Sequence, residues 1–115
     1  MNDSVLNLLG LCRRAGRLSL GHDACKQAIN SGKAKLCIIC SDASERLSDE
    51  ISGLAKAHNK TVYDVKYTML DIKQALSFKA AVFTVDDEGF AKSLRKHLEP
   101  VCNENGDRNG KNESL

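Results

Sequence analysis

Cations and glycines are concentrated in one short stretch of this chain, which is its strongest indication of chemistry. The stretch reads RRAGRLSLGHDACKQAINSGKAKL and runs from Arg13 to Leu36. A predicted helix begins in its middle, and five cations flank that helix: Arg13, Arg14, Arg17, Lys33 and Lys35. The free backbone N–H groups of a helix start and nearby cations both favour an anionic partner. The stretch therefore predicts a phosphate-bearing partner, and nucleic acid is the first one to test.

Short links on both sides of this helix predict that the flanking cations converge. Few residues join the end of the preceding helix, the start of this one and the turn at Gly32. Small residues such as Gly16 and Gly21 permit a close approach of the backbone to a ligand. We therefore expect the five cations to hold phosphates together on one edge of the molecule.

The distribution of charge is more informative than its sum. The 115-residue chain has a net charge of only +2. Residues 1–35 hold six Lys or Arg against two acids, whereas residues 42–50 hold four acids against one Arg. A protein with one cationic and one anionic side docks on a polyanion in a single orientation. A mixed, solvated surface is the alternative explanation of the same charges.

Two groups containing cysteine could carry chemistry, but each has a simpler explanation. Cys37 and Cys40 form a C-x-x-C, yet a spacing of three in a strand places the two side chains on opposite faces. No second Cys or His pair completes a zinc site. His22, Asp23 and Cys25 diverge around a helix, so helix capping by Asp23 or an RNA contact is favoured over acid–base catalysis.

The remaining chemical patterns also argue against an enzyme. The acids at positions 86–88 are typical of residues that stabilise the dipole of a helix start, rather than of a cation site. Neither G-x-G-x-x-G nor GK followed by Ser or Thr occurs. We therefore expect no catalysis, no cofactor, no metal and no small-molecule substrate, with a cysteine-dependent enzyme as the weakest alternative.

Cysteine usage and the N-terminus predict a reducing, cytoplasmic location. The five cysteines are an odd number, and Cys12, Cys25 and Cys37 fall in apolar patterns where a reduced thiol behaves as a small hydrophobe. The N-terminal MNDSVLNLLG lacks the basic region of a signal peptide, and no stretch approaches the length of a membrane span.

The elements that must position the cations alternate between helix and strand. The first half of the chain predicts a helix over Asp3–Ala15, a left-handed Gly16, a brief extended segment Leu18–Leu20, a helix over His22–Ser31 and a strand over Lys35–Cys40 buried on both faces. The second half predicts a polar loop Ser41–Glu45, a helix Ser48–His58, a strand Thr61–Val65, a helix Met69–Leu76 capped by Thr68, a strand Ala80–Val85 and a last helix from Asp86 to about Leu98.

This alternation predicts the α/β class, as a three-layer α/β/α sandwich around a small mixed sheet of about four strands, the short segment near Arg17 included. The predicted domain spans residues 1–102, and Pro100 ends its last helix. Residues 103–115 are polar and too poor in apolar side chains to offset their ordering entropy, so we expect a disordered tail.

With these residues assembled, the chain resembles the kink-turn-binding ribosomal protein superfamily that includes the archaeal seven-Ae and eukaryotic thirty-e proteins. It is most similar to the small bacterial YlxQ-like branch. The resemblance runs from about Val5 to Leu98 and is carried by LLGLCRRAGRLSLG, SGKAKLCIICSDASE and AAVFTVDDEGFAKSL. It implies a non-enzymatic, ribosome-associated protein that binds structured RNA.

In that family the second helix begins with Gly-x-Asn-Glu-x-x-Lys and enters the major groove beside tandem sheared G·A pairs. The resemblance places the family's glycine on Gly21, its Asn on Asp23, its Glu on Ala24 and its Lys on Gln27. The glycine is retained, whereas an acceptor and a cation of base readout are missing. Lys26 lies one position away and points to a different side of the helix.

The family's second contact is the loop before the last strand, which corresponds here to Ser77, Phe78 and Lys79. Phe78 either stacks on an extruded nucleotide or packs in the core, and both explanations remain open. The loop Ser41–Ser44 is expected near the same edge.

The sequence thus predicts a monomer that binds a structured, ribosomal RNA, with no membrane partner. The flanking cations hold phosphates, and the helix start faces base edges with His22, Asp23 and Gln27. Lys26 and Lys79 complete the predicted site. A protein–protein interaction module that keeps the fold and has lost base readout is the alternative.

Overall fold

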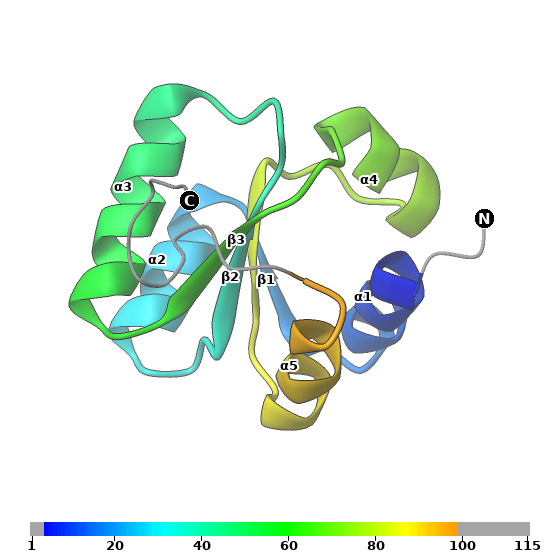
Figure 1. Ribbon diagram of the computed structural model, residues 1–115, viewed down its shortest axis with the longest axis horizontal. Coiled ribbons are helices and arrows are strands. Elements are labelled where there is room, and N and C mark those ends of the chain that lie inside the picture. Colours follow the sequence, from blue (N-terminus) through cyan, green and yellow to red (C-terminus); the bar gives the residue numbers. More distant parts are fainter. Residues whose placement is uncertain (1–3, 99–115) are drawn as a thin grey trace, which may run out of the picture.

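Four short strands form one mixed sheet with helices on both faces (Figure 1). The computed structural model describes residues 4–98 of the chain. Its elements are α1 (Ser4–Arg14), β1 (Leu18–Leu20), α2 (His22–Asn30), β2 (Leu36–Ile39), α3 (Glu45–Ala57), β3 (Thr61–Asp64), α4 (Met69–Leu76), β4 (Val82–Val85) and α5 (Glu88–Arg95). The strand order across the sheet is β1-β4-β2-β3. The predicted α/β sandwich with a small mixed sheet is confirmed.

The direction of the strands determines where every loop lies. β4 is antiparallel to both β1 and β2, so these two strands are parallel to each other, and β3 is parallel to β2. α2 therefore connects two parallel strands, from the end of β1 to the beginning of β2. Such a crossover helix starts at one edge of the sheet and finishes at the opposite edge.

The two faces of the sheet have separate hydrophobic cores. α2 and α3 cover one face, where Ile29 and Ile51 pack on Cys37 and Ile39 of β2. α1, α4 and α5 cover the other face around Phe83 of β4 and the alternate residues of β2. Cys37 and Cys40 belong to different cores, which confirms that their side chains point to opposite faces.

Local signals predicted most helix ends. α4 has the predicted bounds, and Thr68 with Asp71 forms a reciprocal capping box. The predicted start of α3 at Ser48 is wrong, because the Ser44 hydroxyl accepts the Leu47 N–H at 3.2 Å and the helix begins at Glu45. α5 ends at Arg95 instead of about Leu98.

Other predicted bounds differ by one or two residues or fall outside the structure. α1 stops one residue before Ala15, and Gly16 adopts φ 72°, the predicted left-handed conformation. Residues 1–3 and 99–115 lie outside the described residues, and with them the boundary at residue 102, the stop at Pro100 and the predicted disordered tail.

Candidate nucleic-acid interface

The start of α2 differs from the starts of the three helices that follow it. α3, α4 and α5 are each capped by a side chain, whereas the N-cap of α2 is Gly21, which has none to offer. The prediction that Asp23 caps this helix is wrong: Asp23 lies within the first turn, and its side chain is 97% exposed. The first-turn N–H groups of α2 are thus left without a side-chain acceptor, which suits an anion.

Gly21 sits in a backbone conformation that side chains rarely permit. Its φ of 93° and ψ of 172° fall in a region that is essentially restricted to glycine. Its N–H donates to the carbonyl of Val82 at 3.0 Å, which fixes the helix start against the beginning of β4. No atom lies within 4 Å of where a Cβ would be, so the glycine is required by conformation and not by crowding.

Two further segments lie at the same edge of the sheet. Cys40 N–H donates to Ala81 O at 2.8 Å, which joins the end of β2 to the segment before β4. The Asp42 carboxylate accepts the N–H of Met69 at 3.0 Å and ties the β2–α3 loop to the start of α4. We call this side of the sheet, with residues 21–27, 41–44 and 77–81, the Gly21 edge. As the resemblance implied, the helix start and both loops lie on it.

An acidic residue of α3 pairs with two of the predicted RNA-binding residues. The carboxylate of Glu50 lies 3.0 Å from His22 Nε2 and 3.2 Å from Lys26 Nζ. His22 and Lys26 are four residues apart, so they share one side of α2, and that side faces α3. These two hydrogen bonds lower the pKa of the Glu50 carboxyl. Gln27 is exposed. No sequence signal pointed to Glu50, because the contact is between two helices.

Phe78 belongs to the core rather than to a free surface. Its ring is 8% exposed and meets Phe83 edge-on with centroids 5.6 Å apart. The Arg13 guanidinium lies 5.4 Å from the ring centroid and covers it. Of the two explanations left open by the sequence, the structure supports core packing, because the ring has no free face for a base. The cations beside this segment are Arg13, which reaches it from α1, and its own exposed Lys79.

The predicted convergence of all five flanking cations is wrong. Asp86 N–H donates to Arg17 O at 2.8 Å, and Lys35 N–H donates to Val85 O at 2.8 Å, so Arg17 and Lys35 lie where β1 and β2 begin. Lys33 joins them, with its Nζ 3.9 Å from the Asp86 carboxylate. These residues form the opposite side of the sheet, which we call the Lys35 edge (residues 15–17, 33–35, 58–60 and 86–87). Arg14 is exposed at the last residue of α1.

The length of α2 explains the separation. A nine-residue helix is roughly 13 Å long, and a crossover helix places its two ends at opposite sheet edges. Residues before β1 therefore meet residues before β2, and both are remote from Gly21. Reading Leu18–Leu20 as a strand parallel to Lys35–Cys40 would have predicted this division from the sequence.

The described cysteines are structural. Burial raises the pKa of Cys12, Cys25, Cys37 and Cys40 to about 12 in each case. Cys25 donates its thiol to the Ser19 carbonyl, with Sγ and O 3.6 Å apart, so its partner is the backbone rather than His22. Among residues 4–98 no group of His, Cys, Asp and Glu is arranged to hold a metal ion. The same residues include no helix with the length and apolarity needed to cross a membrane.

Known proteins resemble this chain in both sequence and structure. The model of the ribosomal protein L7Ae/L30e/S12e/Gadd45 family matches residues 3–95. A curated relative from Enterococcus faecium, named RNA-binding protein YlxQ, is 29% identical over 95 residues, which cover 83% of this chain and 91% of the relative. A solved structure, described as a protein with unknown function from Bacillus halodurans, is similar with a TM-score of 0.76 and 26% identity, covering 81% of this chain and 94% of that one. The chain therefore belongs to the ribosomal protein L7Ae/L30e/S12e/Gadd45 family.

Proposed function

We propose that this protein binds structured RNA, without enzymatic activity, through the Gly21 edge. The observation that carries the proposal is the match of residues 3–95 to a family of ribosomal proteins, together with a relative named as RNA-binding. The uncapped start of α2 supports it, because free N–H groups and the positive end of the helix dipole attract phosphate.

Within this edge, the exposed residues of α2 face base edges and the cations contact the backbone. Asp23 and Gln27 carry the base contacts, with the amide of Gln27 able both to donate and to accept. Arg13 and Lys79 contact phosphates beside the segment before β4. Lys26 and His22 join them only when they exchange Glu50 for RNA.

The RNA that suits this site best is a kink-turn within a ribosomal or similarly folded RNA. Gly21 permits the close approach of the helix start to a widened groove, and the two loops beside it extend the same edge. The test is a titration of the protein with a kink-turn RNA and with the same RNA lacking its G·A pairs. We expect binding of the intact kink-turn to be tighter by about tenfold or more. Equal affinity for both RNAs would refute kink-turn recognition.

One observation favours a protein–protein interaction module as the second candidate. The family's acidic and basic readout positions are Ala24 and Gln27 here, and Glu50 occupies Lys26. Such a module would bind its partner with little dependence on salt, whereas each phosphate contact lowers log K by about 0.9 per decade of salt. The dependence of log K on salt concentration, measured with the binding partner identified in cells, distinguishes RNA binding from a protein–protein interaction module.

A further inference from the structure

The Lys35 edge presents a row of residues, each of which adjoins one of the four strands. Leu18, Val85, Leu36 and Thr61 are successive register partners across the sheet. The residues one step beyond them are therefore neighbours too, in the order Arg17, Asp86, Lys35 and Lys60. Because adjacent strands lie about 4.8 Å apart, this row spans roughly 15 Å. Three of its four members are cations.

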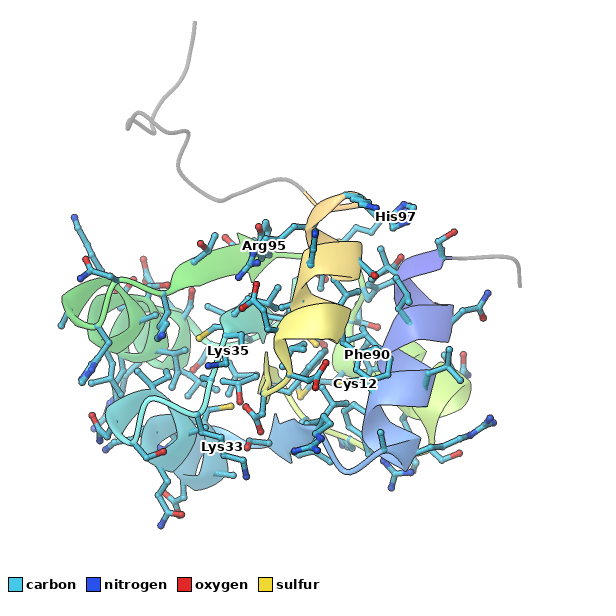
Figure 2. All side chains as sticks on the ribbon, turned by 90° about the horizontal axis from the view of Figure 1, so that it is seen from below. Cys12, Lys33, Lys35, Phe90, Arg95 and His97 are labelled. Carbon is cyan, nitrogen blue, oxygen red and sulfur yellow. The ribbon has the colours of Figure 1, made fainter. Side chains whose placement is uncertain are left out.

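Two more cations extend the row. The side chain of Lys33 is 59% exposed, although its Nζ lies 3.9 Å from Asp86. Arg95 of α5 donates from Nη2 to the carbonyl of Lys35 at 3.3 Å, which places its guanidinium next to the row. Figure 2 shows Lys33, Lys35 and Arg95 following one another along one side of the molecule. The edge therefore carries five cations from four segments of the chain.

Each acid at this edge already has a hydrogen-bond or ion-pair partner. The Asp86 side chain is only 1% exposed and accepts the hydroxyls of Ser19 at 2.6 Å and Thr84 at 2.8 Å. Asp87 accepts the N–H of Phe90 at 2.9 Å as the N-cap of α5. Glu88 is exposed and pairs with Arg95 at 3.0 Å. Five cations thus share the edge with one buried acid, one half-buried acid and one exposed acid that is paired with Arg95.

This arrangement suits a repeating polyanion better than a single small ligand. A small phosphate ligand needs groups that converge on one point, whereas these cations are spread along a line. The described cavity of about 600 Å³ lies elsewhere, between α1 and α4, where Leu6, Tyr67 and Gln74 line it. The edge itself is a row of separate charges that match successive backbone phosphates.

We propose that the Lys35 edge is a second RNA-binding surface, so that one molecule of this protein contacts two RNA segments on opposite edges of its sheet. The inference rests on the proposed function for its first RNA. Its second RNA is recognised mainly through backbone phosphates, because the row is made of Arg and Lys side chains; of the neutral polar residues on this edge, His58 and Asn59 are exposed beside it. A double-stranded segment next to the primary site fits this surface.

The experiment measures binding of a fluorescent 16-base-pair RNA duplex to the preformed one-to-one complex of the full chain and a kink-turn RNA. We expect a ternary complex with one copy of each component, seen by sedimentation velocity. We expect the variant Lys33→Gln/Lys35→Gln/Lys60→Gln to lose about 100-fold in duplex affinity near 0.15 M salt, with a salt slope smaller by about 2.7, because three phosphate contacts are removed. The matched control is Arg46→Gln/Lys66→Gln/Lys73→Gln, which removes the same charge from exposed cations outside the Lys35 edge.

Several outcomes would overturn the inference. Equal losses in the variant and its control would show that only net charge matters. Displacement of the kink-turn RNA by the duplex would show that there is one surface. Retention on phosphatidylserine vesicles through the same lysines, without duplex binding, would assign the edge to a membrane. If the triple variant is unstable, the test is repeated with Arg17→Gln/Lys60→Gln, which keeps Lys33, the ion-pair partner of Asp86.

The two proposals fail in different ways. If the chain does not distinguish the kink-turn RNA from the same RNA lacking its G·A pairs, kink-turn recognition fails, while the duplex is still titrated against the free protein and its lysine variants. If the kink-turn RNA binds and no ternary complex forms, the second surface is wrong and the first stands.

Discussion

Replacing Glu50 by Gln should strengthen RNA binding. Glu50 carries the carboxylate that holds both His22 and Lys26, and all three side chains are about 40% exposed. RNA phosphates compete with the Glu50 carboxylate for Lys26. The negative charge of that carboxylate also repels the phosphates. Glu50→Gln keeps the size of the side chain and removes its charge, so Lys26 becomes available.

The size of the effect follows from counting contacts. One cation released for one phosphate increases the salt slope by about 0.9, which near 0.15 M salt corresponds to about fivefold tighter binding. We expect a fivefold fall in Kd at that salt concentration and a smaller gain at higher salt.

The assay is a fluorescence titration of the kink-turn RNA at four salt concentrations. The matched control is Asp49→Asn, which removes the neighbouring exposed acid of α3. We expect the control to change Kd by less than about twofold, because its charge is screened and holds neither His22 nor Lys26. A weaker affinity in Glu50→Gln would contradict the reasoning and would mean that the carboxylate itself accepts hydrogen bonds from bases.

The same substitution has a predictable effect on acid stability. The folded-state pKa of Glu50 is below its ordinary value of 4.5, because His22 and Lys26 hydrogen-bond to the carboxylate. The interactions of Glu50 with His22 and Lys26 therefore stabilise the fold above about pH 4.5. This contribution disappears as the pH falls through the pKa of Glu50 in the folded protein. The difference in Tm between the wild type and Glu50→Gln should be constant near neutral pH and vanish in acid. A difference that persists in acid would rule out this pair as its source.

Three further predictions concern the scaffold that positions the two edges. Gly21→Ala should destabilise the fold by about 1–3 kcal/mol through backbone strain. Gly53→Ala, inside α3 with no atom within 4 Å of the new Cβ, should stabilise the fold by about 0.5–1 kcal/mol. Equal changes in the Tm of the two variants would contradict this prediction. Asp86→Ala removes the acceptor of the buried Thr84 hydroxyl and of the half-buried Ser19 hydroxyl. We expect a loss of about 3 kcal/mol and a fall in Tm on the order of 10–20 °C, against a small effect of Glu88→Ala. Similar melting curves for the two variants would refute this prediction. Iodoacetamide at pH 8 should leave four buried thiols unmodified in the native protein and label them after unfolding; these thiols are Cys12, Cys25, Cys37 and Cys40. Peptide mass spectrometry measures the labelling. Rapid labelling of the native protein would contradict the raised pKa values of these thiols.

Local sequence signals predicted the fold well because they act over a few residues. The cap at Thr68, the left-handed Gly16 and the apolar run 36–39 depend only on near neighbours, and each was confirmed. The membership of the family was predicted from three ordered stretches, and the comparison confirmed it. The layered α/β class followed from the alternation of elements.

The candidate site was harder to predict because it depends on contacts between distant elements. Glu50 reaches α2 across more than 20 residues of sequence, so neither residue's own segment reveals the pair. Arg17 and Lys35 flank the same helix in sequence, but strand direction takes them to the edge opposite Gly21. Asp86 was predicted to stabilise a helix dipole, whereas the structure uses it as a buried acceptor between β1 and β4.

The most direct test of where RNA binds is the amide NMR spectrum of the protein during a titration with kink-turn RNA. We expect the largest shifts at the first turn of α2, over His22, Asp23 and Ala24, followed by Lys79 and its neighbours before β4. Shifts confined to the cavity between α1 and α4, with the first turn of α2 unchanged, would contradict it.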